Sequence, residues 1–368
     1  MDVCKDAQFV NGTGGVLPVP FSHSQNAVGI HWLRISFPKQ HLAELARWCS
    51  QLWGEMRADG FGLWSYDSRL AWQSGVSLNY DADEERSHRV HLARITLDCP
   101  GSALDEMTAP DLQALIEYAS LLQGKCSRID VYFDDYERFV TFDALQEAAE
   151  RHDFSGLIDF QIRHGGKRGR AGHTREEVSF GKRGSCGNGK YVRWYNKELE
   201  SGGEFTCDRW EVEFTHKRAD AVFKKLAETA GDLEAFATLC GALIVGCVTF
   251  VHRTHEKNIS RLDRYDWWER IVAILGKGVS IRIKRQTDSV TGKLTWIKQN
   301  VSPSLACLKK VFVSERVFLR WLFDICREGD SRMSRYSQRL AEDNEGALDY
   351  EHGKLLTNTG VPYECRVS

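Results

Sequence analysis

Two kinds of hydrophobic pattern divide the chain into short segments. Where apolar and polar residues alternate we expect strands, and where apolar residues recur every three or four positions we expect helices. Strands are predicted at residues 29–37, 127–134, 159–163, 177–181, 190–199 and 208–216, with several short ones within 60–98. Helices are predicted at 40–57, 109–123, 142–151, 218–230, 233–243, 264–275 and 303–326. A turn containing Asp288 and Gly292 predicts a hairpin of residues 279–286 and 293–299.

This order of elements predicts an α+β fold, a curved antiparallel sheet with helices packed on one face, in two similar lobes. Residues 1–25, rich in Gly, Pro and Ser, are expected to form a flexible leader. The main domain is expected over 26–312, followed by a helical segment at 313–340 and an acidic, mobile tail at 341–368.

The composition favours a soluble globular protein in the cytoplasm. Of the 368 residues, 42% are hydrophobic and 27% are charged. The 11 cysteines include no C-x-x-C pair, so we expect reduced thiols rather than a zinc knuckle or a disulfide framework. No secretory signal is visible, and the uncharged stretch at 235–251 is short for a membrane span. It predicts a buried helix that runs into a core strand.

Three predicted strands each place charged residues and tyrosines on one face and apolar residues on the other. The polar positions are Arg128, Asp130, Tyr132 and Asp134 in RIDVYFDD, Tyr191, Arg193, Tyr195 and Lys197 in YVRWYNK, and Arg209, Glu211 and Glu213 in RWEVEF. Any half-exposed antiparallel sheet has a polar face, so one such strand would indicate nothing more. Three in succession suggest a site in which carboxylates bind Mg²⁺ or Mn²⁺.

The metal ligands expected first are Asp130 and Glu213, with Glu211 and Asp134 as further candidates on the same faces. Such a metal would polarise a phosphodiester. Of the three tyrosines, Tyr195 lies between Arg193 and Lys197, and two cations are expected to favour its phenolate, the form that attacks phosphorus.

Two segments have a local excess of positive charge, although the formal net charge of the chain is −2. Residues 161–197 contain ten Lys or Arg and two acidic residues, together with many glycines, and residues 277–310 contain eight Lys or Arg and one Asp. Either segment could be a solvated loop, or it could contact DNA phosphates. The expected DNA-binding residues are Lys167, Arg168, Arg170, Lys182, Arg183, Arg282, Lys284 and Arg285. Trp296 could stack on unpaired bases, whereas the face of Trp194 favours a core role.

Two absent motifs narrow the chemistry. The sequence has no H-x-H pair, so a metal held by a histidine pair is not supported. It also has no G-x-x-x-x-G-K-[ST] motif, so the chain is not expected to be its own helicase.

Three segments resemble, in order and spacing, the motifs of the replication initiation factor family, the Rep_trans-type rolling-circle initiators of small plasmids and filamentous phages. They are RIDVYFDD, FGKRGSCGNGKYVRWYNKELE and RWEVEF. GIHWLRISFP, the G-F-G segment at 60–62 and the segment at 296–308 are similar to the phage branch, so the resemblance spans roughly 28–312. His31 stands where relatives often carry an acidic residue.

The resemblance implies an enzyme that binds an origin as double- and single-stranded DNA, nicks one strand and later rejoins it. It also implies a divalent metal, a 5′-phosphotyrosine link and a host helicase as partner. By position it points to Tyr195 as nucleophile, to Asp130, and to Glu211 or Glu213. A homodimer remains open, and no membrane partner is expected. The alternatives are a non-catalytic origin-binding or repressor protein, and a metal-dependent nuclease that uses water.

Overall fold

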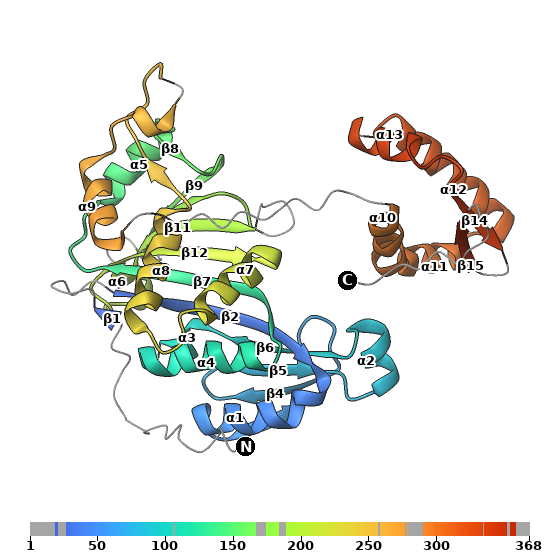
Figure 1. The fold of residues 1–368 in the computed structure, drawn as a ribbon, viewed down its shortest axis with the longest axis horizontal. Coiled ribbons are helices and arrows are strands. Elements are labelled where there is room, and N and C mark those ends of the chain that lie inside the picture. Colours follow the sequence, from blue (N-terminus) through green and yellow to red (C-terminus); the bar gives the residue numbers. More distant parts are fainter. Residues whose placement is uncertain are drawn as a thin grey trace. The chain divides into compact units, whose positions relative to one another are not determined.

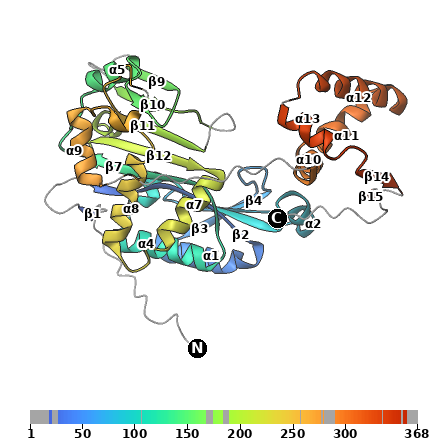
Figure 2. The same ribbon diagram turned by 45° about the horizontal axis from the view of Figure 1, so that its top comes forward.

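A computed structural model of the chain describes residues 19–20, 27–105, 107–166, 174–183, 189–256, 258–276, 278, 290–333, 335–351 and 354–357. The chain forms two compact units, Met1–Ile283 and Lys284–Ser368. The first unit is an antiparallel sheet with helices, and the second is mainly helical (Figures 1 and 2).

Over the described residues, the sheet of the first unit has 11 strands, ten of them in one path. Their spatial order is β3 (Met56–Asp59), β4 (Ser68–Trp72), β5 (Ser77–Tyr80), β6 (Arg94–Cys99), β2 (Ala27–Pro38), β7 (Lys125–Asp135), β12 (Asp208–Thr215), β11 (Lys190–Asn196), β10 (Arg175–Phe180) and β9 (Phe160–Gly165). The short β1 (Val19–Pro20) pairs with β2. All of these pairings are antiparallel, as the sequence predicts.

The sheet consists of two lobes with the same order of elements. In the first lobe β2 is followed by α1 (Leu42–Trp53), β3, β4, β5, β6 and α4 (Ala109–Leu121). In the second, β7 is followed by α5 (Phe142–Glu150), β9, β10, β11, β12 and α7 (His216–Ala227). The first strands of the lobes, β2 and β7, are neighbours at the centre, and the others follow outward in the same order. The prediction of two similar lobes is confirmed.

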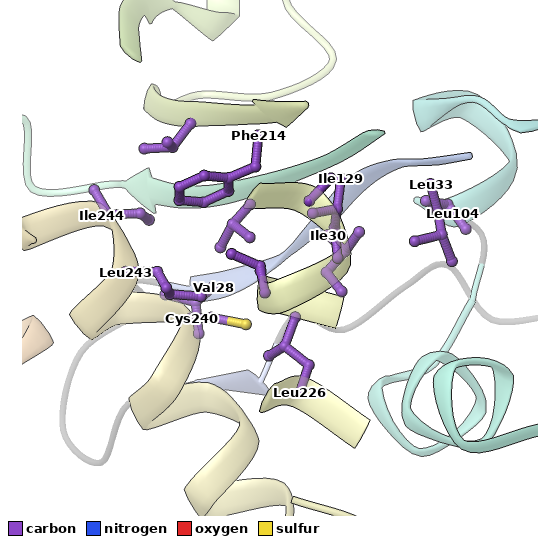
Figure 3. Packing of buried hydrophobic residues seen from close by; sticks show 14 of the residues in the cluster. Val28, Ile30, Leu33, Leu104, Ile129, Phe214, Leu226, Cys240, Leu243 and Ile244 are labelled. Carbon is purple, nitrogen blue, oxygen red and sulfur yellow. The ribbon is translucent and has the colours of Figure 1, made fainter. Parts of the chain in front are cut away.

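Helices cover one face of this sheet. In both ribbon views α4, α7 and α8 (Leu233–Val245) lie on the same side of the central strands (Figures 1 and 2). Figure 3 shows the apolar contact of α7 and α8 with the strands. It involves Val28, Ile30, Ile129 and Phe214 on the sheet and Leu226, Cys240, Leu243 and Ile244 on the two helices. These side chains are almost completely buried, and their burial is the main source of stability.

Smaller elements complete the first unit. They are α2 (Glu84–Val90), α3 (Gly101–Leu104), β8 (Phe154–Ser155), α6 (Lys197–Ser201), β13 (Thr249–Phe250), α9 (Asp266–Leu275) and short 3₁₀ turns at Lys39–His41 and Ile259–Arg261. The uncharged stretch at 235–251 forms most of α8 and then β13, as predicted. Within the described ranges, no helix is long and apolar enough to cross a membrane.

One predicted strand is wrong. Residues 293–299 belong to α10 (Val290–Trp296) and the π-helical turn Ile297–Val301, which continues into α11 (Ser302–Val311). The apolar residues Leu294, Ile297, Val301 and Leu305 are three or four positions apart, and this helical spacing outweighs the short alternation around Trp296. The partner segment 279–286 lies entirely outside the described residues.

The predicted helix at 303–326 is divided in two. It ends as α11 at Val311 and restarts as α12 (Glu315–Asp330), where the Ser314 side chain accepts a hydrogen bond from the amide of Val317. The second unit continues with α13 (Arg335–Glu342) and a hairpin of β14 (Leu348–Glu351) and β15 (Lys354–Thr357).

Candidate active site

The sheet face opposite α7 and α8 carries the charged residues and tyrosines of β7, β11 and β12. The strands pair so that these side chains form rows across the sheet. One row contains Tyr191, Glu213, Asp130 and Trp32, the next Arg193, Glu211, Tyr132 and Gly29, and the third Tyr195, Arg209, Asp134 and Ala27. The polar face predicted from alternation therefore exists, and we call it the polar face below.

Tyr195 and Glu211 form a contact of the kind expected between a nucleophile and its base. The Tyr195 hydroxyl donates a hydrogen bond to Oε2 of Glu211 over 3.1 Å. Arg193 donates to Oε1 of the same carboxylate from Nε (3.1 Å) and from a terminal nitrogen (2.7 Å). The Arg193 guanidinium also lies 4.8 Å from the centre of the Tyr195 ring. Glu211 thus accepts hydrogen bonds from the hydroxyl and from a cation.

The electrostatic expectation for Tyr195 is wrong. Only 4% of this residue is exposed, and burial, reinforced by the negative charge of Glu211, raises its pKa well above the usual value despite Arg209 and Arg193. For Glu211, burial acts to raise the pKa, but the positive charges of Arg193 and Arg209 and the hydrogen bond from Arg193 contribute to lowering it overall. Tyr195 is therefore a neutral phenol whose proton points at an ionised carboxylate.

Asp130 and Glu213 face each other across β7 and β12, with Arg128 between them. One terminal nitrogen of Arg128 lies 2.6 Å from Oδ2 of Asp130 and 3.2 Å from Oε2 of Glu213. Burial raises the pKa of Asp130 to about 7, with Arg128 opposing that rise. Both carboxylates are buried, because they lie on central strands and are closely surrounded.

The residue types at this position fit a hard divalent cation. Carboxylate oxygens are the ligands that Mg²⁺ and Mn²⁺ prefer, and two of them already share one positive charge. Within the described part of the chain, no group of three or more His, Cys, Asp or Glu side chains is arranged to hold a metal. A cation between Asp130 and Glu213 would therefore compete with the guanidinium of Arg128.

A fully buried ion pair lies beside Tyr195, and the sequence alone did not single it out. Arg209 donates to both carboxylate oxygens of Asp134, over 2.6 and 2.8 Å. Its guanidinium also lies 4.1 Å from the centre of the Tyr132 ring and hydrogen-bonds to Nδ1 of His31 (3.1 Å). Both oxygens of Asp134 are thus bound by an arginine, as both oxygens of Asp130 are bound by Arg128 (2.9 and 2.6 Å).

The position of His31 depends on a β-bulge in β2. The register with β7 shifts between Ile30 and Trp32, so that both His31 and Trp32 contact residues of the polar face. Two glycines in the sequence mark the places where these rings need room. A Cβ atom on Gly101 would come within 2.1 Å of the His31 ring, and one on Gly29 within 2.7 Å of the Tyr132 hydroxyl. Neither position can carry a larger residue without displacing these rings.

The predicted cationic residues occupy different surroundings. Lys197, the first residue of α6, binds Glu200 (2.7 Å) and lies 5.8 Å from the centre of the Tyr195 ring. Arg183 contacts Oε2 of Glu213 (3.1 Å) and lies over the Tyr191 ring, whereas Lys182 binds Asp159 on the surface. The remaining basic candidates, Lys167, Arg168, Arg170, Arg282, Lys284 and Arg285, lie outside the described residues. Trp194 is buried in the core, as predicted, and Trp296 is exposed.

Two more buried carboxylates lie at the ends of the same strands. Asp135 and Asp208 are paired across β7 and β12, and burial raises their pKa values to about 6 and about 7. Asp135 accepts the amide proton of Phe139 through Oδ2, but in the described part of the chain its Oδ1 has no hydrogen-bond partner. These two side chains bind protons more tightly in the folded protein than in the unfolded chain.

Stability is therefore expected to fall as the pH rises from about 4 to about 7, because a raised carboxyl pKa favours the folded state only while the group is protonated. Asp208→Asn should reduce this fall and stabilise the protein at pH 8 by on the order of 1–2 kcal/mol. Denaturant unfolding at pH 5 and pH 8 measures the effect. Glu228→Gln, at a side chain that is 66% exposed, is the control. An equal loss with pH in Asp208→Asn and the parent would contradict the assignment.

The fold and the site together define an open, two-lobed antiparallel sheet with helices on one face and a buried cluster of tyrosines, carboxylates and arginines on the other. A sequence profile of the replication initiation factor family (Rep_trans) matches residues 124–322, more than half of the chain. The chain belongs to the replication initiation factor family. The matched region contains Asp130, Tyr195, Glu211 and Glu213 and begins just before β7.

A solved structure, the rolling circle replication initiator protein from Geobacillus stearothermophilus, has a similar fold. The match has a TM-score of 0.54 at 15% sequence identity and covers 70% of this chain and 100% of that one. At this identity the likeness shows the fold alone. No protein with a curated description matches the chain.

Proposed function

We propose that this protein initiates rolling-circle replication by nicking one strand of origin DNA with Tyr195. The observation that carries the proposal is the hydrogen bond from the Tyr195 hydroxyl to Glu211, which pairs a nucleophile with a proton acceptor beside two arginines. Membership of the replication initiation factor family supports it.

In the proposed step the Tyr195 oxygen attacks the scissile phosphorus as its proton passes to Glu211. The bond between phosphorus and the 3′-oxygen breaks, and the departing oxygen takes up a proton from solvent. The products are a 3′-hydroxyl for a polymerase and a 5′-phosphate on the tyrosine. The phosphotyrosine bond conserves the energy of the broken linkage, so a later attack by a 3′-hydroxyl can rejoin the strand. Arg193 and Arg209 would stabilise the negative charge that develops on the phosphate oxygens.

The burial of Tyr195 has a consequence for this step. Because only 4% of the residue is exposed, DNA must displace side chains that surround the hydroxyl before phosphorus can reach it. A water-excluded site strengthens the attraction between arginine and phosphate and disfavours hydrolysis of the phosphotyrosine.

Asp130 and Glu213 are proposed as the ligands of Mg²⁺ or Mn²⁺, with Glu211, on the neighbouring row, as the fallback ligand if either is excluded. When bound, the metal would polarise the scissile phosphodiester. Arg128, which now joins the two carboxylates, would have to release them where the metal binds.

The substrate is origin DNA, double-stranded before the nick and single-stranded after it, and strand separation is assigned to a host helicase. The first unit would bind DNA through its basic loops, and a homodimer remains open. We place the reaction in the cytoplasm, where buried thiols such as Cys49 and Cys126 stay reduced.

The loop basic residues provide a quantitative test. Replacing Lys167, Arg168 and Arg170 with alanine should weaken DNA binding and lower the slope of log affinity against log salt by roughly 2–3, because each lost phosphate contact contributes about 0.7–0.9. Fluorescence anisotropy at 50–300 mM salt, roughly the range over which screening changes most, measures the slope. The control replaces Lys224 and Lys225, which lie on α7 at the helix-covered face. An unchanged slope would remove the loop from the interface.

One incubation distinguishes the proposed function from its alternatives. Supercoiled DNA carrying the cognate origin is mixed with the protein and Mn²⁺, and the products are separated under denaturing conditions. We expect an open circle with protein attached to the 5′ end. A repressor or origin-binding protein would shift the DNA without cutting it, and a nuclease that uses water would cut it and leave both ends free.

A further inference from the structure

The loop between β3 and β4, Gly60–Asp67, exposes a group of large apolar side chains at the polar face of the first lobe. Phe61 is 65% exposed, Trp64 42% and Leu63 38%. The loop lies outside the region matched by the family profile, and nothing in the nicking chemistry above uses it. Exposed aromatic residues so close together commonly mark a binding surface.

This aromatic loop is held rigidly in a strained conformation. Trp64 and Ser65 have φ angles of +52° and +68°, a region that non-glycine residues rarely adopt. Their carbonyl groups accept hydrogen bonds from side chains that are themselves partly exposed, His91 to Trp64 (3.2 Å) and Arg86 to Ser65 (2.5 Å). The Leu63 amide donates to Asn79 (2.8 Å). Strain that is maintained by several contacts typically belongs to a functional site.

Arginines of the polar face lie beneath the two aromatic rings. The Arg34 guanidinium is 4.1 Å from the centre of the Trp64 ring, and that of Arg69 is 5.2 Å from the centre of the Phe61 ring. Arg34 is paired directly with Arg128 across β2 and β7, so the loop lies over the same sheet face as the proposed active site.

A continuous series of contacts joins the loop to that site. Arg128, which binds Asp130 and Glu213, lies 4.3 Å from the centre of the Trp32 ring. Trp32 donates a hydrogen bond to Oδ1 of Asp98 (2.9 Å), and Arg34 donates to the same oxygen (2.8 Å). Arg34 in turn contacts the Trp64 ring. Alternating arginines and aromatic rings therefore extend from the carboxylates to the exposed loop.

The repeat of the two lobes supplies an independent argument. The loop between β3 and β4 in the first lobe corresponds in element order to the loop between β9 and β10 in the second. That second loop carries Lys167, Arg168 and Arg170, the residues expected to contact phosphates. The two lobes thus present a basic loop and an aromatic loop at equivalent places in the chain.

We propose that Trp64 and Phe61 form a stacking platform for unpaired bases of the DNA strand that leads away from the nicking site. Aromatic rings bind bases of any sequence through their faces, and the arginines beneath them attract the adjoining phosphates. The inference rests on the proposed function for the identity of the ligand, which is single-stranded DNA. A duplex, whose bases are already stacked, offers the platform nothing to bind.

Binding to short oligonucleotides tests the platform without any cleavage. Parent, Trp64→Ala and the double variant Phe61→Ala/Trp64→Ala are titrated, without divalent metal, against a fluorescein-labelled 30-nucleotide single strand and against the same sequence as a duplex. Trp64→Ala should weaken single-strand binding about tenfold and the double variant further, because each stacked base contributes a factor of this order. Duplex binding should change less than about twofold, since it depends on phosphate contacts.

Leu121→Ala is the matched control, since Leu121 is 79% exposed but lies on α4 at the helix-covered face. Single 2-aminopurine substitutions add a positional readout: quenching in the parent should occur at one or two neighbouring nucleotides and disappear in Trp64→Ala. Unchanged single-strand affinity, or an equal loss on the duplex, would overturn the platform. The nicking proposal fails separately, if Tyr195→Phe still forms the covalent link while Trp64→Ala shows its binding defect.

Discussion

Tyr195→Phe is expected to abolish the covalent link between protein and DNA and to lower nicking by at least about a thousandfold, because no other atom at that position can attack phosphorus. The change removes one oxygen. Glu211 keeps both hydrogen bonds from Arg193, so the free energy of unfolding should fall by only about 1 kcal/mol. Nicking of supercoiled DNA and thermal melting measure the two effects.

Tyr191→Phe is the matched control for this variant. Tyr191 lies on the same strand and face, directly opposite Glu213, but among the described residues its hydroxyl has no hydrogen-bond partner. We expect it to nick at close to the parental rate. If Tyr191→Phe loses the covalent link and Tyr195→Phe keeps it, the nucleophile is Tyr191, in the first row of the polar face, and not Tyr195, in the third.

Asp130→Asn and Glu213→Gln are expected to lower nicking by at least about a hundredfold and to weaken Mn²⁺ binding, because each loses one charged oxygen donor. Both replacements keep the shape of the side chain and an oxygen that Arg128 can bind, so the variants should remain folded. Titration calorimetry with Mn²⁺ alone separates metal binding from turnover.

Asp153→Asn is the control for these carboxylates. Asp153 is equally buried in the same unit, where it accepts from Tyr265 (2.7 Å) and the amide of Arg253 (3.0 Å), away from the polar face. It should leave Mn²⁺ binding unchanged. Parental nicking by Asp130→Asn at limiting Mn²⁺ would exclude that residue as a ligand, and Glu211 would become the next candidate.

Alternation along single strands was sufficient to predict the faces of β7, β11 and β12, because a period of two is a local property of the backbone. The same residues could not reveal that Asp130, Glu211 and Glu213 are buried, since burial depends on which strands and loops surround them. The expectation of a phenolate at Tyr195 is wrong for this reason. The sequence shows two neighbouring cations, which on their own would lower the pKa of the hydroxyl, but it does not show the larger effect of burial, which raises that pKa.

Other features needed the register between distant strands. The pairing of Arg209 with Asp134 and the contacts of His31 with Arg209 and Asp105 join residues 74 to 178 positions apart. The contacts of His31 also depend on a one-residue bulge. Within residues 293–299 alone, the apolar positions fit the two-residue period of a strand as well as the 3.6-residue period of a helix. Only the longer stretch that ends at Leu308 favours a helix.

The most direct test of the account is to identify the residue that carries DNA after the nick. Protein trapped on origin DNA is digested with nuclease and protease, and the modified peptide is sequenced by tandem mass spectrometry. The account predicts a nucleotide bound through its 5′-phosphate to Tyr195, in the peptide that contains YVRWYNK. A nucleotide on Tyr191 or on any other side chain, or nicked DNA without a modified peptide, would contradict it.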